Sequence, residues 1–143
     1  MEDPYRLNRF IRAHQQDFDL AARELRGGEK HNCWMWYIFP QIRGLGFSET
    51  SSYYAIGSLE EAKAYLENDY LRGHMEELCR ILLSLNGRSA RDIFGGVDSM
   101  KLHSSMTLFA AAAGEQTPLY QQVLDRYFGG EMDQRTLSIL NAQ

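Results

Sequence analysis

The sequence predicts an all-α protein, a single compact domain of about seven helices with no substantial sheet. Three observations predict this fold class. Apolar residues recur at spacings of three and four along most of the 143 residues, which is the period of an amphipathic helix. Capping residues precede these stretches and glycines follow them. No convincing stretch alternates apolar and polar residues as a half-buried strand does.

The first predicted helix begins at Pro4, because Asp3 can cap it and proline is favoured at the first helical position. Its apolar face continues until the glycine pair that starts at Gly27. We expect a break near Gln15–Asp17, since an aspartate at the end of this stretch can cap a second helix.

Two helices are predicted in the middle of the chain. The first starts at Ser58, which matches a capping box with Glu61, and it ends at Asn68. The second carries the strongest helical stripe, which consists of Met75, Leu78, Cys79, Leu82 and Leu85. The apolar run Trp34–Phe39, which precedes both, is interpreted as a buried helical turn because Pro40 disfavours the α conformation in the residue before it.

Further helices are predicted in the last part of the chain. Ser89 caps a short helix that Gly95 closes, and Asp98 caps a longer one. Another begins at Pro118, and Asp133 caps the last one. Because no linker rich in glycine, serine or proline divides the sequence, we expect one domain over residues 1–143.

Composition excludes several classes of function. Fifteen Lys and Arg against nineteen Asp and Glu give a net charge of −4, and this charge is spread evenly, whereas a nucleic-acid surface concentrates positive charge. No signal peptide is recognised, and the longest apolar run has six residues, far fewer than a membrane span needs. We expect a cytoplasmic protein with reduced cysteines that binds neither nucleic acid nor a membrane.

The common catalytic and metal-binding motifs are not found in the sequence. His31 and Cys33, like His74 and Cys79, lack the spacing of zinc ligand pairs. The segment Gly44–Gly46 resembles the start of a dinucleotide-binding fingerprint, but the third glycine and the surrounding βα unit are missing. We therefore expect no metal and no cofactor.

Two segments hold more aromatic and polar residues than core packing explains. The first spans residues 30–54 and contains both tryptophans, two positions apart, so that they cannot share one helix face. Trp36 and Tyr54 are candidates for stacking on a flat ligand group, and Gln41 and Ser48 for reading its polar edges. The alternative is that the tryptophans anchor the core and that the serine caps a helix.

The second segment spans Asp98 to Phe109. Lys101, Ser104 and Ser105 share one helix face and are candidates for holding an anionic group such as phosphate. A lysine near a serine also occurs in Ser–Lys nucleophile pairs, and a hydrolase that uses Asp98 with Lys101 is another interpretation. The alternative is an exposed lysine beside serines that pack against a neighbouring helix.

The same segments carry a family resemblance. WMWYIFPQIRGLGFSETSSYYAI, EEAKAYL and IFGGVDSMKLHSSMTLFAAAA, in this order, resemble the bacterial family catalogued as domain of unknown function 1810. The resemblance spans nearly the whole chain and implies a small, mainly α-helical protein of one domain without an established activity. Cys33 stands where many relatives have histidine. The positions that match the family's motifs are Lys30, Trp34, Trp36, Phe39, Pro40, Gln41, Gly44, Leu45, Gly46, Ser48, Tyr54, Asp98, Lys101, Ser104, Ser105 and Phe109.

Two functions stay open at the level of sequence. The first is a domain that binds a small nucleotide-derived or phosphorylated metabolite between the two segments, with or without hydrolase activity. The second is a protein-interaction module without catalysis, in which exposed aromatic side chains form a contact patch. A single pocket is excluded if the segments lie more than about 15 Å apart. Ligand identity, and the choice between monomer and homodimer, are not predicted.

Overall fold

A computed structural model describes residues 2–143 and confirms the all-α fold class. Its helices within this range are α1 (Asn8–Arg26), α2 (Met35–Ile38), α3 (Glu49–Tyr54), α4 (Leu59–Glu67), α5 (Asp69–Ser84), α6 (Ala90–Ala113), α7 (Leu119–Phe128) and α8 (Gln134–Asn141). A short 3-10 helix, η1 (Gly114–Gln116), joins α6 to α7. None of these helices has the length and apolar character needed to cross a membrane.

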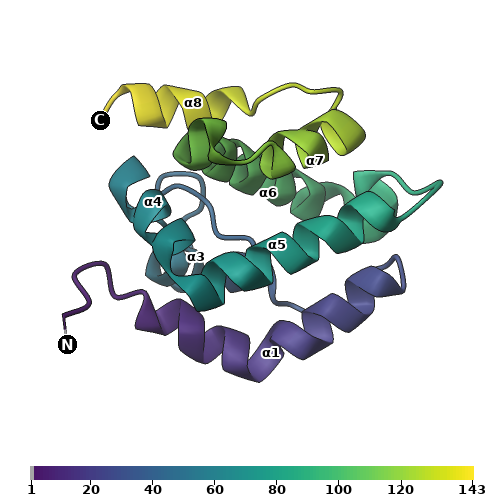
Figure 1. Cartoon of the computed structure of the whole chain (residues 1–143), viewed down its shortest axis with the longest axis horizontal. Coiled ribbons are helices and arrows are strands. Elements are labelled where there is room, and N and C mark those ends of the chain that lie inside the picture. The colour runs from purple at the N-terminus through teal and green to yellow at the C-terminus, as the bar shows by residue number, and fades with distance from the viewer. Residues whose placement is uncertain (1) are drawn as a thin grey trace.

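The helices stack around α6, the longest of them. In Figure 1, α1 lies along the bottom, α5 packs above it, α6 and α7 follow, and α8 covers the top. α6 contacts α4, α7 and α8. Buried apolar side chains of α1, α2, α4, α5, α6 and α7 form one core cluster. Burial of each large apolar side chain stabilises the fold by roughly 1.5–3 kcal/mol.

The first helix begins later than predicted. The expected start at Pro4 is wrong, and α1 begins at Asn8. The chain before it makes a turn in which Arg6 has a φ of 52°, a conformation that cannot continue into a helix. Asp3 still acts as a cap, because its carboxylate accepts hydrogen bonds from the backbone N–H groups of Leu7 and Asn8 at 2.8 and 3.0 Å.

The break predicted within the first helix is also wrong. α1 continues through Gln15–Asp17 without interruption. The Asp17 carboxylate accepts a hydrogen bond from the hydroxyl of Tyr37. It is therefore used for contact with α2 and does not cap a second helix.

The capping box predicted at the start of α4 is only half formed. Oγ of Ser58 accepts a hydrogen bond from the N–H of Glu61 at 3.1 Å, as expected. The Glu61 carboxylate, however, accepts from the N–H of Gly57 at 2.9 Å and from the Arg9 guanidinium at 2.8 Å. A buried cation from α1 thus takes the place of the expected reciprocal contact.

The two helices predicted around Gly95 are present as the two parts of α6, which the non-helical backbone of Gly95 separates. Ser89 and Asp92 make a complete capping box at its start, with both hydrogen bonds at 3.0 Å. Gly95 has a φ of 80° and a ψ of 172°, so the helix bends there. The prediction that Asp98 caps the second half is wrong, because its carboxylate binds two lysines instead.

The run Trp34–Phe39 forms the predicted helical turn as α2, and Pro40 follows its end. The chain then makes an isolated parallel β-bridge with the segment after α3. In this bridge Ile56 donates its N–H to the carbonyl of Gln41, and Arg43 donates to the carbonyl of Ile56, both at 2.8 Å. The bridge therefore ties the first part of the α2–α3 loop to the segment that follows α3.

The α2–α3 loop leaves no room for a side chain at Gly46. A Cβ there would lie 2.8 Å from Cβ and Oγ of Ser51 and 3.2 Å from Cη2 of Trp36. We expect Gly46→Ala to lower the free energy of unfolding by about 1–3 kcal/mol, as overpacking does, and urea denaturation measures this change. The control is Gly73→Ala in α5, where a Cβ meets nothing within 4 Å. It should be neutral or stabilising, and equal stability of the two variants would contradict this interpretation.

Candidate functional site

The two segments singled out in the sequence meet at Trp36 and Lys101. Nζ of Lys101 lies 4.0 Å from the centroid of the Trp36 ring, a close cation–π contact. The separation that would exclude a shared pocket is therefore not observed. The tryptophans also differ in burial as expected, since Trp34 belongs to the core and Trp36 is half-buried.

One carboxylate holds two lysines beside Trp36. Oδ2 of Asp98 lies 2.7 Å from Nζ of Lys30, and Oδ1 lies 3.0 Å from Nζ of Lys101. Burial raises the pKa of Asp98, but the hydrogen bonds and charges of the two lysines outweigh it, so the pKa falls below its ordinary value. Asp98 is therefore ionised, and the cluster of these three side chains carries one net positive charge.

Local structure positions this cluster. Lys30 follows α1, and its backbone N–H donates to the carbonyl of Ile93 at 2.7 Å, which ties the loop to the first half of α6. Asp98 and Lys101 lie three positions apart in the second half of α6, beyond the kink at Gly95. Side chains at this spacing share a helix face, so both reach the loop.

Two pockets of about 130 Å³ each lie on either side of the Trp36–Lys101 contact. The first, here called the lysine pocket, is lined by Lys30, Cys33, Met35, Trp36, Asp98 and Lys101. The second, here called the glutamine pocket, is lined by Trp36, Gln41, Leu45, Val97, Met100, Lys101 and Arg135. Each is smaller than the roughly 300–1,000 Å³ of a typical ligand site. Each therefore suits one part of a small ligand.

The walls of these pockets are positive although the chain is acidic overall. Lys30, Lys101 and Arg135 line them together with Asp98. Arg135 is paired with Asp133 at 3.4 Å, so the excess positive charge comes from the two lysines, whereas the whole chain has a net charge of −4. Charge of one sign around a hollow raises the local concentration of ligands of the opposite sign. The site therefore favours anions.

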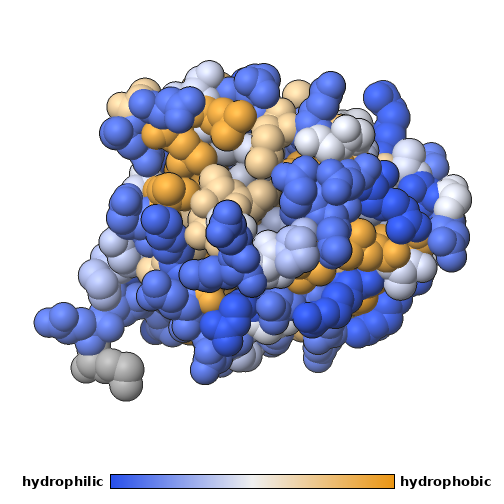
Figure 2. All heavy atoms as spheres, turned by 45° about the horizontal axis from the view of Figure 1, so that its top comes forward, coloured by the Kyte–Doolittle hydropathy of each residue, from blue (hydrophilic) through white to orange (hydrophobic). Residues whose placement is uncertain are grey.

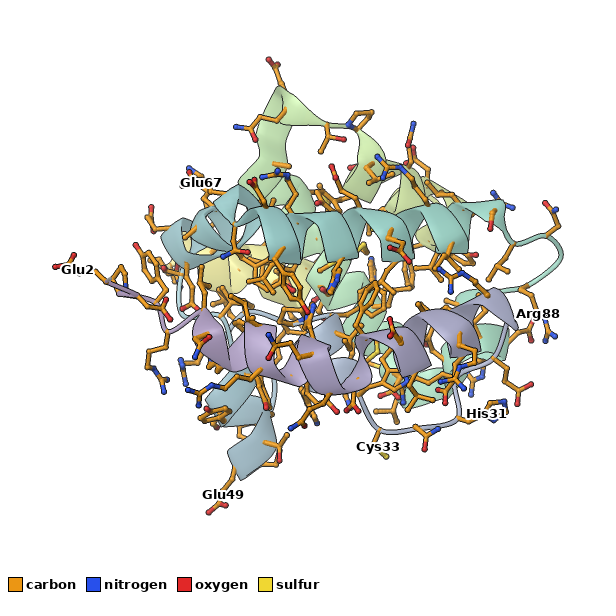
Figure 3. All side chains as sticks on the ribbon, turned by 60° about the horizontal axis from the view of Figure 1, so that its bottom comes forward. Glu2, His31, Cys33, Glu49, Glu67 and Arg88 are labelled. Atoms are coloured by element: carbon orange, nitrogen blue, oxygen red, sulfur yellow. The ribbon has the colours of Figure 1, made fainter. Side chains whose placement is uncertain are left out.

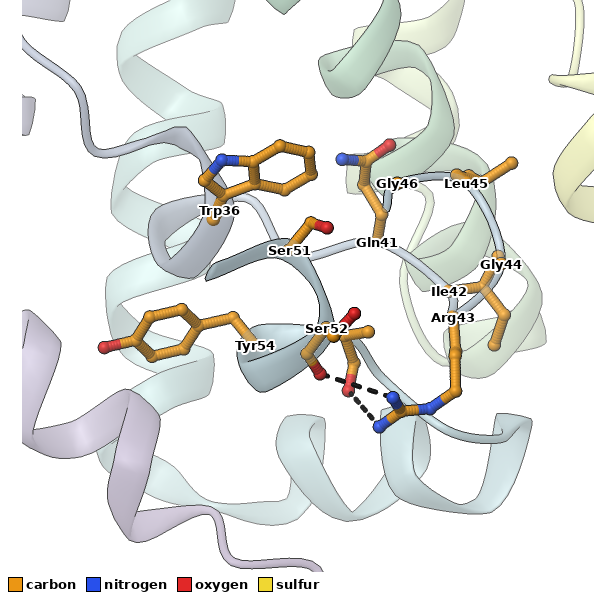
Figure 4. Close-up of a pocket in the computed structure, with 11 residues that line it drawn as sticks. Trp36, Gln41, Ile42, Arg43, Gly44, Leu45, Gly46, Ser51, Ser52 and Tyr54 are labelled. Carbon is orange, nitrogen blue, oxygen red and sulfur yellow. Dashed lines mark hydrogen bonds between the residues drawn. The ribbon is translucent and has the colours of Figure 1, made fainter. Parts of the chain in front are cut away.

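Gln41 is a largely buried residue whose side-chain amide lines two pockets and has no hydrogen-bonding partner within residues 2–143. Gln41 is 7% exposed, and its side-chain amide forms no hydrogen bond with any other part of residues 2–143. In Figure 4 the amide points toward the ring of Trp36. Such an amide presents a donor and an acceptor to whatever occupies the pocket.

Tyr54 does not form a second wall opposite Trp36 for a flat ligand group. The pocket that the two residues share, shown in Figure 4, has room for about 20 Å³, enough for one water molecule. The Tyr54 ring packs instead against Tyr37 and Phe10, with centroids 5.0 and 5.9 Å apart. The structure differs here from the expectation that Trp36 and Tyr54 stack on the same group.

The two serines predicted beside Lys101 lie in the interior. Ser104 and Ser105 are fully buried. Oγ of Ser104 lies 2.8 Å from Oδ2 of Asp133, to which it donates, and Oγ of Ser105 has no partner within residues 2–143. Because neither lines the pockets at Trp36, the structure does not place them where they would hold an anion with Lys101. A Ser–Lys pair is not formed either, since Lys101 binds Asp98.

The remaining residues of the α2–α3 loop have structural roles. Oγ of Ser48 accepts a hydrogen bond from the N–H of Ser51 at 3.1 Å and caps α3. Ser48 is exposed and does not line the pockets around Trp36. Gly44 has a φ of 111°, and a Cβ there would lie 3.3 Å from Ile139 of α8. Close packing therefore accounts for the glycine, and no dinucleotide motif is needed to explain it.

The cysteine and histidine pairs weighed as metal ligands lie in different surroundings. His31 and Cys33 are exposed on the loop between α1 and α2 (Figure 3), and Cys79 is buried in the core. Nδ1 of His74 lies 3.0 Å from Nδ1 of His14 between α1 and α5. Burial lowers the pKa of His14 to about 4. Residues 2–143 contain no group of three or more ligand side chains that could hold a metal ion.

Several pocket residues were not predicted as such. Lys30 was noted only as a family position, and Arg135 was not noted at all. Val97 and Met100 are 70% and 54% exposed on α6. Apolar residues outside the core stripe of a helix are a signal that sequence reasoning could have used. Arg135 comes from α8, and its approach to Trp36 depends on tertiary packing.

Comparison with known proteins gives two matches. The model of the family described as "Protein of unknown function (DUF1810)" matches residues 4–140. The crystal structure of the conserved hypothetical protein Rv1873 from Mycobacterium tuberculosis is similar, with a TM-score of 0.95 and 42% sequence identity. This similarity covers 99% of this chain and 100% of that one. No curated protein matches the chain.

Proposed function

The chain belongs to the DUF1810 family of proteins of unknown function, and from the geometry of its site we propose that it binds a small phosphorylated metabolite with a flat ring, such as a nucleotide-derived compound. The observation that carries the proposal is the arrangement around Trp36. Lys101, held by Asp98, lies over the half-buried ring of Trp36, and the unpaired amide of Gln41 lines the same hollow.

The lysine pocket is where we place the phosphate. The ammonium groups of Lys30 and Lys101 converge on Asp98 from two sides, and a single carboxylate leaves one positive charge without a counter-charge. Ammonium groups form strong hydrogen bonds with phosphate oxygens. An anion that enters the pocket can therefore bind both lysines without displacing Asp98.

The glutamine pocket is where we place the ring. Trp36 offers an aromatic face, and Leu45 and Met100 add apolar walls. Flat rings stack favourably on such a face. Because the two pockets share Trp36 and Lys101, the ring and the phosphate can belong to one molecule.

We propose binding without hydrolysis. A general acid must be protonated near the working pH, and two lysines keep Asp98 ionised. Ser104, the serine considered as a nucleophile beside Lys101, is fully buried and donates to Asp133. These contacts favour a site that binds a ligand without cleaving it.

The binding test compares charge-removing variants of two lysines. We expect AMP, ADP-ribose, NAD or ribose phosphate to raise the melting temperature, because a ligand at one hundred times its Kd adds about 2.7 kcal/mol of stability. Lys101→Met keeps the aliphatic stem on Trp36 but removes the charge. It should weaken binding about tenfold or more in calorimetric titration, since a hydrogen bond to a charged group contributes about 1.5–3 kcal/mol.

Lys63→Met is the matched control, because Lys63 is exposed on α4 and forms no ion pair within residues 2–143. It should leave the affinity unchanged. Equal effects of Lys63→Met and Lys101→Met, or no stabilisation by any compound of the panel, would contradict the proposed function.

A second function, contact with another protein, is favoured by exposed apolar side chains, two of which, Val97 and Met100, line the glutamine pocket. Phe47, Val97 and Met100 are 96%, 70% and 54% exposed, and Figure 2 shows apolar patches interrupting a mostly hydrophilic face of the molecule. If a second copy covers these side chains, sedimentation shows a dimer that Phe47→Ser dissociates. If the protein sediments as a monomer at every concentration, contact between two copies through these side chains is contradicted.

A further inference from the structure

We infer that Gln41 sets the specificity of the site for a ring edge that carries a hydrogen-bond donor next to an acceptor, as the edge of adenine does. This inference rests on the proposed function.

Gln41 is unusual among the buried polar residues of the chain. Eleven polar or charged residues within residues 2–143 are buried, and nine of them form side-chain hydrogen bonds with other described residues. The exceptions are Gln41 and Ser105, and of these two only Gln41 lines a pocket beside Trp36. Only Oγ of Ser105 is both enclosed and unpaired within residues 2–143, so the amide atoms of Gln41 remain accessible from the pockets that Gln41 lines. Water or a ligand can therefore form the hydrogen bonds that the chain does not supply to this amide.

The Gln41 side-chain amide is also held in a position where a ligand can form hydrogen bonds with it. The Gln41 backbone is fixed by Pro40 before it and by the hydrogen bond from Ile56, 2.8 Å long, to its carbonyl. On one side the side chain borders the pocket that has room for one water molecule, and on the other it borders the glutamine pocket. A water molecule can bind the amide from the smaller pocket. The glutamine pocket can then hold a larger group that binds the amide from the other side.

The shape of the glutamine pocket fits recognition of a flat edge. Leu45 and Met100 are apolar walls, so neither offers the rim of a ring a strong hydrogen bond. A carboxamide presents an N–H donor and a C=O acceptor in one plane. It pairs with adenine through the exocyclic amino group and the neighbouring ring nitrogen. A ring with acceptors only leaves one atom of the amide unpaired.

Three ligands separate the contributions of edge, ring and phosphate. AMP carries all three, purine riboside monophosphate lacks the exocyclic amino group, and ribose phosphate lacks the ring. For the unaltered protein we expect AMP to bind about tenfold tighter than purine riboside monophosphate, which is within the usual worth of a bidentate contact. In Gln41→Met this preference should disappear, while the affinity for ribose phosphate stays unchanged.

Retained binding of ribose phosphate also shows that the variant is folded. Its melting temperature without ligand should stay close to that of the unaltered protein, because the Gln41 amide forms no hydrogen bond with the rest of residues 2–143 that the substitution could remove. If Gln41→Met does not fold, Gln41→Leu is measured in the same way and should also lose the preference for AMP.

Two results overturn the inference and leave the proposed function intact. One is that Gln41→Met, like the unaltered protein, binds AMP more tightly than purine riboside monophosphate. The other is equal affinity of the unaltered protein for both compounds. Binding of none of the three ligands overturns the proposed function and this inference together.

Discussion

Arg9→Met is expected to lower the free energy of unfolding by about 3–5 kcal/mol, because it leaves a buried carboxylate without its counter-charge. Nη2 of Arg9 lies 2.8 Å from Oε2 of Glu61, and the two side chains are 3% and 9% exposed. The guanidinium also donates to the backbone carbonyls of Tyr5, Arg6, Tyr53 and Ala55. One cation thus joins the start of α1 to the end of α3 and to α4.

Arg23→Met provides the control for this prediction. Arg23 is exposed on the same helix and forms no ion pair within residues 2–143, so its replacement should change stability by about 0.5 kcal/mol or less. Urea denaturation near neutral pH measures both variants. A loss below about 1 kcal/mol for Arg9→Met would mean that the ion pair contributes no more than an exposed one does.

Glu24→Gln is expected to cost about 2–3 kcal/mol near pH 7 and progressively less toward acidic pH. Oε1 of Glu24 accepts hydrogen bonds from the backbone N–H groups of His31 and Asn32 at 2.8 and 3.1 Å, and from Nε1 of Trp34 at 2.9 Å. Oε2 accepts from the side-chain amide of Asn32. Burial raises the pKa of Glu24, but these hydrogen bonds outweigh it and lower the pKa to about 2.

The direction of the pH dependence follows from this lowered pKa. A carboxyl group whose pKa is lower in the folded state stabilises that state fully above its unfolded pKa, about 4.3. This contribution is lost as the pH falls toward 2, the folded value. Stability of the unaltered protein and of Glu24→Gln should therefore converge between about pH 4.5 and 2. If the difference in free energy of unfolding between the two proteins stayed constant over this range, the lowered pKa of Glu24 would be contradicted. Glu67→Gln, which replaces an exposed glutamate, is the control.

Features that depend on contacts within one helical turn were predictable from the sequence. Ser58, Ser89 and Asp133 cap α4, α6 and α8 as their positions indicated. The apolar stripe of α5 lies in the core, and the run Trp34–Phe39 is helical. In each case the residues that decide the structure are near neighbours in the chain.

Three predicted capping interactions failed for a common physical reason. Asp17, Asp98 and the carboxylate of Glu61 each bind a partner that is distant in the sequence. A cation or hydroxyl brought close by tertiary packing competes with the local backbone N–H groups for the carboxylate oxygens. No pattern within a single turn reveals such a competitor.

The candidate site was predictable in part. The abundance of aromatic and polar residues in two segments identified Trp36, Gln41 and Lys101, and the structure brings all three together. It turns Ser104 and Ser105 inward, because the phase of α6 against its neighbours decides which face is buried. That phase, like the absence of a partner for the Gln41 amide, is a property of packed helices and is not visible in a sequence.

Heteronuclear NMR of the two indole N–H groups tests the proposed site most directly. Trp36 lines both pockets, whereas Trp34 is buried and its indole donates to Glu24. Trp36→Phe assigns the two signals. On addition of AMP the Trp36 signal should shift and saturate while the Trp34 signal stays in place. A titration that moves neither signal, or that moves the Trp34 signal alone, would contradict a ligand site at Trp36.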